Sequence, residues 1–367
     1  MQEILSNFNI RGEFVSCVNF GLGDINLSYE VIYNENGNLK KYLLQRINHK
    51  VFRNIEGLIN NISLVTEYLK DKILEEGGDP KRETLTLIKT KSGKNFYFDE
   101  EIKKYFRLYL FIEDVISYEK TDDLAVLKEA GRAISHFVEQ LADFDNSQLI
   151  SVIPNLHNSV RHYENLFDSL KKDNLYRSKL IEAEVAFVKE RENELHIIPK
   201  LIENNIIPKR VTHNDTKLNN ILFDAKSKKA ICIIDLDTIM PGTVLFDYGD
   251  AIRYAASTSL EDEKDLTKVN LDINKFEAFT EGYLTSGPLV LNQAELDHLV
   301  FAAKIVTLEC GIRFLTDFLN GDVYFKTSRA HQNLDRARTQ FKLVREIEKH
   351  YKFLTSIVQN IRTGKGK

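Results

Sequence analysis

The stretch THNDTKLNNILFD (212–224), followed by ICIIDLD (231–237), holds the densest group of polar residues in the chain. Two apolar runs, NILF and ICIID, enclose the polar segment AKSKKA, and this pattern predicts a small antiparallel hairpin. Asn220 stands at the entry of the first strand and Asp235 at the exit of the second. Because an antiparallel hairpin brings these two ends together, we expect Asn220 and Asp235 to face one another.

An amide oxygen beside a carboxylate forms a hard-oxygen site that suits Mg²⁺ carrying nucleotide phosphates. Asp215 precedes Asn220 by five residues, so it is expected to stand beside that metal, where it could orient and deprotonate an acceptor hydroxyl. An isolated His-x-Asp is a weak signal and is more often an acidic surface turn. The hairpin, Asn220 and Asp235 in the expected order favour a site over such a turn.

Composition limits what kind of protein this is. The chain has 367 residues, 43% of them apolar and 28% charged, which is typical of a globular protein with one or two domains. Its 50 basic and 54 acidic residues give a net charge of −4, so no basic excess indicates a nucleic-acid or membrane partner. The start MQEILSNFNI has no signal-peptide pattern, and Cys17, Cys232 and Cys310 are widely spaced. We therefore expect a cytoplasmic protein with reduced thiols.

The first third of the chain alternates strands and turns around one helix. The turn Asn36-Gly37 predicts a hairpin, and the apolar spacing of residues 58–73 predicts an amphipathic helix that ends before Gly77-Gly78-Asp79-Pro80. The predicted strands are 14–20, 27–33, 41–47, 84–88, 95–98 and 106–114.

Beyond Asp114 the pattern becomes helical, apart from the small hairpin. Helices are predicted at 124–141, 177–195 and 294–319. We therefore predict an α+β chain of two parts, a β-rich part over residues 1–113 and a mostly helical part over 114–367.

The His213–Asn220 loop with its strand-borne Asp235 resembles the catalytic pattern of protein-kinase-like phosphotransferases, and His-Asn-Asp resembles the His-Gly-Asp of the aminoglycoside phosphotransferase and choline kinase group. Further stretches resemble the N-acetylhexosamine 1-kinases: GLGDINLSYEV, LLQRIN, LFIED, IDLDTIMPGTVLFDYGDAIR and LECGIRFLTDFLNGDVYF. These blocks extend from residue 21 to about residue 325. The resemblance implies a bilobal protein-kinase-like fold, ATP and Mg²⁺ as cofactors and a small-molecule substrate.

On the nucleotide side, the resemblance makes Gly21-x-Gly23 the expected lid over the ATP phosphates and the backbone of Phe111 and Glu113 the adenine contact. Kinases carry a phosphate-anchoring lysine on the third strand, where this chain has Gln45 and Arg46. Strand alternation points these two side chains to opposite faces, and we favour Arg46 because of its charge, with a solvated basic residue as the alternative. The acidic helix partner is open, since Asn60 stands where relatives tend to have Glu.

On the acceptor side, Arg313 and Tyr324 match the sugar-holding positions of the resembled kinases, and Asp247 matches the residue that supports the catalytic loop. A surface ion pair between Glu309 and Arg313 is the alternative for Arg313. His213 is expected to brace the loop rather than to move protons.

The predicted reaction is transfer of the ATP γ-phosphoryl group to a sugar hydroxyl, most simply the anomeric hydroxyl of N-acetylglucosamine or N-acetylgalactosamine. Asp215 would accept the proton, while Asn220 and Asp235, with Asp237 as a second acidic contributor, would hold Mg²⁺. The alternatives are a kinase of an aminoglycoside, choline, homoserine or another sugar, and a non-catalytic ATP-binding module. We expect a monomer or weak dimer, with neither nucleic acid nor membrane as a partner.

Overall fold

The computed structural model describes residues 1–21, 25–285 and 290–364. Its residues group into two compact units. The first comprises Met1–Ile116, Asp143–Ile153 and Leu222–Pro241, and the second comprises Ser117–Ala142, Pro154–Ile221 and Gly242–Lys367. The first segment of the first unit ends close to the predicted boundary at residue 113, whereas its two later segments return from the helical part of the sequence.

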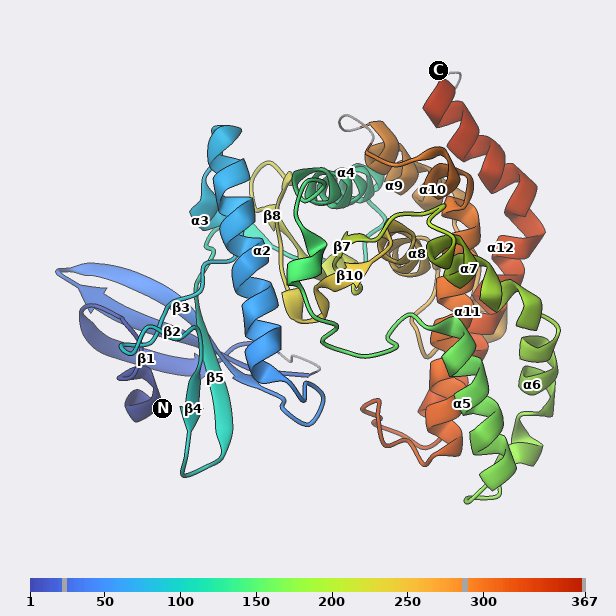
Figure 1. Ribbon diagram of the computed structural model, residues 1–367, viewed down its shortest axis with the longest axis horizontal. Helices are drawn as coiled ribbons and strands as arrows, with labels where there is room; N and C mark the ends of the chain where they lie inside the picture. The colour runs from blue at the N-terminus through green and yellow to red at the C-terminus, as the bar shows by residue number, and fades with distance from the viewer. Residues whose placement is uncertain (22–24, 286–289, 365–367) are drawn as a thin grey trace. The chain divides into compact units, whose positions relative to one another are not determined.

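The first unit is built on a five-stranded antiparallel sheet with the order β1-β2-β3-β5-β4 (Figure 1). The turn between β2 and β3 has positive φ at both Asn36 (55°) and Gly37 (86°), the backbone that a two-residue hairpin needs, so the predicted hairpin is confirmed. The strands are β1 (Glu13–Asn19), β2 (Leu27–Glu35), β3 (Asn38–Ile47), β4 (Tyr97–Asp99) and β5 (Lys104–Leu110).

The helices of the first unit are α1 (Gln2–Leu5), α2 (Ile55–Glu75) and α3 (Pro80–Glu83). α2 confirms the predicted amphipathic helix: it buries Leu58, Ile62, Val65, Leu69 and Ile73 and ends before the Gly77-Gly78 break. The prediction of a strand at 84–88 is wrong, because this segment forms only an isolated bridge from Leu87 to Tyr109.

A second, three-stranded sheet has the order β6-β8-β9. Its strands are β6 (Val115–Ile116), β8 (Ile221–Asp224) and β9 (Ala230–Ile233). β8 and β9 are the predicted small hairpin, so the polar residues of the opening stretch lie at its ends. Asn220 closes the 3₁₀ turn Leu218–Asn220 directly before β8, and Asp235 follows β9 by two residues.

The second unit is mostly helical, as predicted, and α11 packs against α5, α8 and α12 (Figure 1). Two of its predicted helices are interrupted: 177–195 contains only one α-helical segment between 3₁₀ turns, and 294–319 is divided at His298. The elements are α4 (Leu124–Gln140), α5 (Ser159–Lys172), α6 (Glu182–Lys189), α7 (Ile197–Glu203), β7 (Arg210–Thr212), α8 (Val244–Ala255), α9 (Ile273–Thr285), α10 (Gln293–Asp297), α11 (Leu299–Leu319) and α12 (Gln332–Thr363); β10 (Met240–Gly242) crosses the unit boundary.

Gly249 sets the distance between helices α8 and α11. A Cβ on Gly249 of α8 would lie 2.7 Å from the carbonyl oxygen of Ala302 in α11, so the two helices approach more closely than any other residue permits. This packing brings the helix that carries Asp247 and Asp250 beside the helix that carries Glu309 and Arg313.

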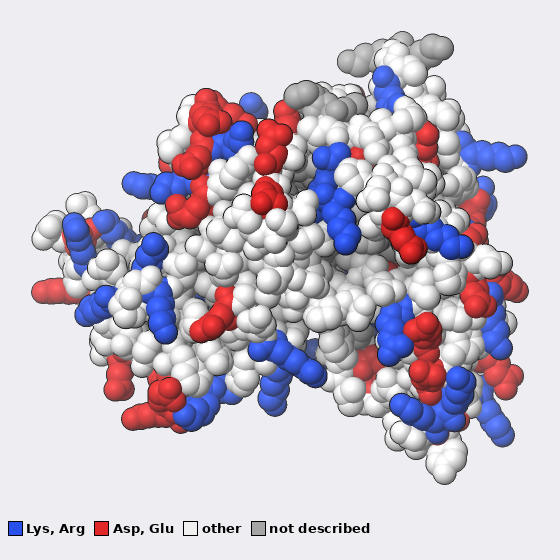
Figure 2. Space-filling model, in the orientation of Figure 1, with Lys and Arg blue, Asp and Glu red and all other residues white. Residues whose placement is uncertain are grey.

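On the face shown in Figure 2, basic and acidic side chains are interspersed, as expected from a net charge of −4. Cys17, Cys232 and Cys310 are free thiols. Within the described part of the chain, no helix is both long enough and apolar enough to cross a membrane.

Candidate active site

The loop before β8 is held by the carboxylate of Asp247, which comes from the first turn of α8. The backbone N–H of His213 donates to Asp247 Oδ2 at 2.9 Å, and the N–H of Asn214 donates to Oδ1 at 2.7 Å. Asp247 is fully buried, and this burial raises the pKa of its carboxyl despite the two donors. The predicted support of the loop by Asp247 is thus confirmed.

His213 is also fully buried, and its ring faces inward. Its Nδ1 accepts the backbone N–H of Asp215 at 3.2 Å, and its ring contacts Phe137 edge-to-face at 6.3 Å between centroids. Because one nitrogen accepts a loop hydrogen bond inside a closed core, the ring stabilises the backbone around Asp215 and is not placed to exchange protons with a substrate. The bracing role predicted for His213 is confirmed.

Asn214 has a left-handed backbone, with φ of 64°. Few residues other than glycine tolerate this region, and Asn is among them because its short amide can bond locally. Here its Nδ2 donates to the carbonyl oxygen of Thr212 at 3.0 Å. The left-handed backbone explains how Asn can stand where the resembled His-Gly-Asp pattern has glycine.

The left-handed backbone of Asn214 can be tested by substitution. We expect Asn214→Gly to lower the melting temperature by no more than a few degrees and to keep kcat, since glycine adopts this φ without strain. Asn214→Val should lower the free energy of unfolding by about 1–3 kcal/mol, because a β-branched residue is strained there. Thermal melting and kinetics on both variants check this, and equal losses in the two would contradict it.

Asp215 lies at the exposed end of this loop with both carboxylate oxygens engaged. Lys217 Nζ lies 3.3 Å from Asp215 Oδ1, and Asn220 Nδ2 donates to Asp215 Oδ2 at 3.1 Å and to its carbonyl oxygen at 2.8 Å. Since the amide nitrogen of Asn220 is committed to Asp215, its amide oxygen is the atom left for a ligand. The structure therefore brings together Asp215 and Asn220, two residues predicted to act together.

Asp235 belongs to the first unit and Asn220 to the second, so their predicted pairing stays a prediction. Asp235 has φ of 60°, the second left-handed non-glycine residue of the opening stretch. Such backbone conformations are rare and cluster at functional sites. In the described residues there is no group of three or more His, Cys, Asp or Glu side chains that could hold a metal.

Asp237, predicted as a second acidic contributor to the metal, has both oxygens bound within the first unit. Its Oδ2 accepts from Asn26 Nδ2 at 2.6 Å, and its Oδ1 accepts from the guanidinium of Arg107. Asp237 and Arg107 are almost completely buried, with side chains 5% and 2% exposed. The pairing makes Asp237 the anchor of a buried cation, while its contribution to a metal stays a prediction.

Arg107, on β5, is a residue that sequence reasoning missed. Its Nε donates to Gln45 Oε1 at 2.9 Å, and Gln45 Nε2 donates in turn to Ser28 Oγ at 3.0 Å. Burial alone would lower the pKa of Arg107, but Asp237 outweighs it and keeps the group charged. The available signal was a single basic residue within the largely apolar run FRLYLFIED.

The cross-strand register settles which face Arg46 occupies. Gln45 pairs with Arg107, whereas Arg46 pairs with Phe106, so Arg46 lies on the opposite face of the sheet from Arg107. Phe106 and Leu44 belong to the hydrophobic core on that face. Gln45, not Arg46, therefore shares the face of Asp237, and the role of Arg46 in anchoring phosphate stays a prediction that this geometry does not favour.

The other residues predicted on the nucleotide side are Gly21, Gly23, Phe111 and Glu113. Gly21 has φ of 71° and open space where a Cβ would be, and Gly23 lies outside the described residues. The N–H of Phe111 already donates to the carbonyl oxygen of Lys41 at 3.1 Å, so this group is not offered to a base. The side chain of Glu113 forms an ion pair with Lys41 Nζ at 2.7 Å. The adenine contacts of Phe111 and Glu113 stay predictions.

On the acceptor side, Arg313 and Tyr324 meet at one ring. The guanidinium of Arg313 lies 5.5 Å from the centroid of Phe325, and the Tyr324 ring contacts Phe325 edge-to-face at 4.8 Å. Tyr324 is 54% exposed. The alternative surface pair of Arg313 with Glu309 is not formed: Glu309 is buried and bonds His157 Nδ1 at 2.9 Å.

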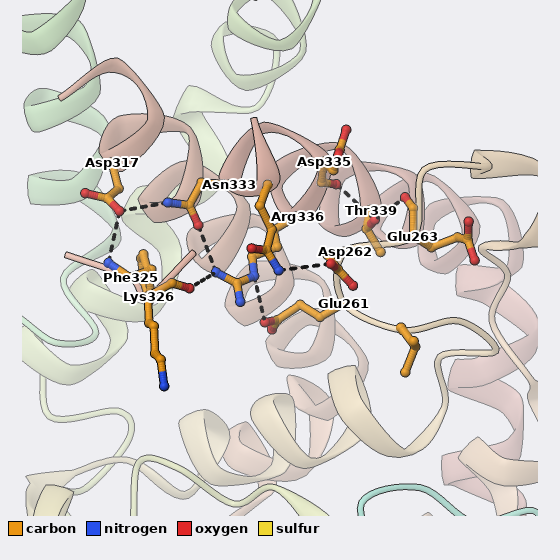
Figure 3. A network of polar contacts seen from close by, with 12 residues as sticks. Glu261, Asp262, Glu263, Asp317, Phe325, Lys326, Asn333, Asp335, Arg336 and Thr339 are labelled. Carbon is orange, nitrogen blue, oxygen red and sulfur yellow. Dashed lines mark hydrogen bonds and ion pairs between the residues drawn. The ribbon is translucent and has the colours of Figure 1, made fainter. Parts of the chain in front are cut away.

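The loop that carries Tyr324 is held by the buried carboxylate of Asp317 (Figure 3). Asp317 accepts the backbone N–H groups of Val323, Tyr324 and Phe325 at 3.0, 2.9 and 3.0 Å. Asn333 Nδ2 adds a fourth bond at 2.9 Å. Four donors on one carboxylate fix the backbone of the loop and so limit where the Tyr324 side chain can reach.

An antiparallel sheet unit and a helical unit with a braced His-Asn-Asp loop define the kinase-like phosphotransferase class of fold. Residues 96–270, which include that loop, match the model of the phosphotransferase enzyme family.

Solved structures agree on the fold over almost the whole chain. A microcompartment-associated aminopropanol kinase is 14% identical with a TM-score of 0.60, and the match covers 96% of this chain and 97% of that one. A spectinomycin phosphotransferase bound to ADP and spectinomycin is 15% identical with a TM-score of 0.56, covering 97% of both chains. An aminoglycoside phosphotransferase from Alicyclobacillus acidocaldarius subsp. acidocaldarius is 11% identical with a TM-score of 0.59, covering 99% and 96%. The predicted fold class is confirmed.

Proposed function

We propose that this protein is an ATP-dependent kinase that phosphorylates a hydroxyl group of a small molecule. The observation that carries the proposal is the carboxylate of Asp215, positioned by Lys217 and Asn220 on a loop whose backbone is braced by Asp247 and His213. This loop lies within the residues that match the phosphotransferase enzyme family.

Asp215 acts on the acceptor hydroxyl. It orients the oxygen and accepts its proton while the acceptor O–P bond forms and the bond from the γ-phosphorus to the β,γ-bridging oxygen breaks, leaving ADP. Lys217 Nζ, 3.3 Å from Asp215 Oδ1, helps to hold this carboxylate in position.

Mg²⁺ fits the residues proposed for it, because the Asn220 amide oxygen and the Asp235 carboxylate are the hard oxygens this ion prefers. When bound with ATP, the ion neutralises charge on the phosphate oxygens. Arg107 is charged and shares the sheet face of Gln45. We propose that Arg107, in place of Arg46, is the cation of the first unit on the sheet face that the ATP phosphates approach.

For the acceptor, we propose the anomeric hydroxyl of N-acetylglucosamine or N-acetylgalactosamine. The resemblance of GIRF and GDVYF to the hexosamine kinases supports it, as does the meeting of Arg313 and Tyr324 at Phe325. An amino alcohol or aminoglycoside is the second candidate, because two of the structural neighbours are an aminopropanol kinase and a spectinomycin phosphotransferase. A cationic acceptor calls for an uncompensated carboxylate, and Arg313 at this place opposes it.

The substrate panel tests the proposal directly. Purified protein is incubated with ATP, Mg²⁺ and each of N-acetylglucosamine, N-acetylgalactosamine, aminopropanol, choline, homoserine and spectinomycin, and ADP and the phosphorylated position are measured. We expect a sugar 1-phosphate from at least one hexosamine. Phosphorylation of an amine compound alone would replace the sugar by the second candidate. Binding of ATP without turnover of any compound would instead indicate a non-catalytic module.

A further inference from the structure

We propose that His157 and Asp250 bind hydroxyl groups of the acceptor and so form part of the substrate site of the second unit. The proposal rests on the proposed function and extends its acceptor site to two residues for which the sequence indicated no role. It is carried by two buried polar atoms for which the described residues supply no hydrogen-bond partner.

His157 precedes α5 and has one nitrogen bound and one unbound. Its Nδ1 bonds the carboxylate of Glu309 at 2.9 Å, and because an ionised carboxylate can only accept, Nδ1 is the donor of this bond. The side chain is only 8% exposed, and Nε2 has no hydrogen-bond partner among the described residues. Burial of an unpaired polar atom is costly, so a missing partner indicates a ligand position.

Asp250 on α8 shows the same asymmetry. Its Oδ1 accepts both Arg253 Nε at 3.0 Å and Arg253 Nη2 at 2.7 Å. The side chain is only 9% exposed, and its Oδ2 is buried and accepts no hydrogen bond from any described residue. Arg253 therefore holds the carboxylate in place through Oδ1 and leaves Oδ2 for a hydrogen-bond donor of a ligand.

His157 and Asp250 lie on the same side of α8. The His157 ring stacks on Phe246 at 4.4 Å with 19° between the planes, and Phe246 precedes Asp250 by four residues, which places both on one helix face. Burial alone would raise the pKa of the Asp250 carboxyl, but Arg253, then Lys217 and His157, outweigh it and hold the pKa below its usual range. Asp250 follows by three residues Asp247, whose carboxylate binds the backbone N–H of Asn214, so the helix turn that carries Asp250 lies beside the loop of Asp215.

The same network connects Asp250 to the loop of Tyr324. Arg253 Nη1 donates to Glu261 at 2.9 Å, and Arg336 Nε lies 3.7 Å from the other oxygen of Glu261. Arg336 Nη1 also donates to Asn333 Oδ1 at 3.0 Å, and Asn333 bonds Asp317 (Figure 3). One chain of polar contacts therefore fixes Asp250 and the acceptor loop relative to each other.

The chemistry of the two atoms selects the ligand. Oδ2 of Asp250 accepts hydrogen bonds, and a sugar hydroxyl, which both donates and accepts and carries no charge, can pair with it and with Nε2 of His157. The negative charge of Asp250 is already paired with Arg253. Burial alone would raise the pKa of the Glu309 carboxyl, but His157 and Arg313 outweigh it and hold this pKa below its usual range. A neutral polyhydroxylated acceptor satisfies both atoms without leaving a cation or an anion unpaired.

Two substitutions remove the unpartnered atoms and keep the bound ones. In His157→Asn the amide can still donate to Glu309 from near the Nδ1 position but lacks Nε2, whereas His157→Gln keeps a polar atom near Nε2. In Asp250→Asn the guanidinium of Arg253 retains the amide oxygen and turns the NH₂ toward the acceptor. Glu295→Gln is the matched control, because Glu295 is fully buried and paired with Arg210, but both of its oxygens have partners.

The dissociation constants for N-acetylglucosamine and N-acetylgalactosamine are measured by calorimetry, and KM for each sugar and for ATP by ADP release. We expect the sugar Kd and KM to rise roughly 10- to 100-fold in Asp250→Asn and roughly 3- to 10-fold in His157→Asn, with less change in His157→Gln and none in Glu295→Gln. KM for ATP should not change. A wild-type protein that neither binds nor phosphorylates these sugars overturns the proposed sugar acceptor, and with it the assignment of His157 and Asp250. If the wild type phosphorylates one of these sugars but Asp250→Asn and His157→Asn keep the same sugar affinity, only the assignment of His157 and Asp250 is overturned.

Discussion

Asp215→Asn is expected to lower kcat by about 10²- to 10⁴-fold while leaving the protein folded, since an amide cannot take the proton of the acceptor hydroxyl. The substituted side chain has nearly the same shape, so it can still accept from Asn220 Nδ2, and the bonds of Asp247 and His213 to the loop are untouched. The measurement is ADP release with the best acceptor of the panel, together with the melting temperature and the shift that ATP with Mg²⁺ produces in it.

The control for this substitution is Asp168→Asn, on an exposed turn of α5, where the side chain is 55% exposed and pairs only with Lys171. It should keep wild-type kcat, because such surface pairs contribute about 0–1 kcal/mol to stability and nothing to the site. If Asp215→Asn kept kcat within threefold of the wild type, Asp215 would not be the base. If it lost ATP-dependent stabilisation as well as turnover, its role would extend to nucleotide binding.

Arg107→Met is expected to lower the free energy of unfolding by about 3–5 kcal/mol, the largest single effect on stability that the structure indicates. It leaves the buried carboxylate of Asp237 with only Asn26 as a donor. Asp237→Leu should cost a similar amount, because it leaves the Arg107 guanidinium charged in the core. The combined variant should recover most of the loss, since replacing both members of a buried pair by apolar groups removes the uncompensated charge.

Chemical denaturation followed by circular dichroism on the four proteins completes the double-mutant cycle. The matched control is the exposed pair of Arg161 and Glu164 on α5, which lies at 2.9 Å with both side chains about half exposed, so that Arg161→Met should change the stability by no more than about 0.5 kcal/mol. Additive losses in the double variant of Arg107 and Asp237 would show that the two residues do not stabilise each other.

The catalytic loop could be predicted from the sequence because its structure is local. Asp215 and Asn220 are five residues apart, and the bonds between them close within a single turn. The Asn36-Gly37 turn and α2 were predictable for the same reason, since glycine tolerance and apolar spacing act over a few residues.

The buried cation that pairs with Asp237 could not be predicted in this way. Arg107 and Asp237 are 130 positions apart, and Arg107 reaches Gln45 only because β3 and β5 pair in one particular register. A shift of one residue would exchange Arg107 for its neighbours and place Arg46 on the other face. The strand at 84–88 failed similarly, because its β-type sequence finds no continuous partner in the sheet and forms only one bridge.

The sequence by itself determined the Asn36-Gly37 turn, helix α2, the small hairpin and the placement of Asp215 and Asn220 on one loop, because these depend on spacing along the chain. Only the tertiary structure decided which buried polar atoms lack a partner. His157 and Glu309 are 152 residues apart, and the close packing of α8 on α11 at Gly249 places the helix of Asp250 beside that of Glu309. Whether a polar atom is satisfied depends on all its neighbours at once, and those neighbours come from distant parts of the chain.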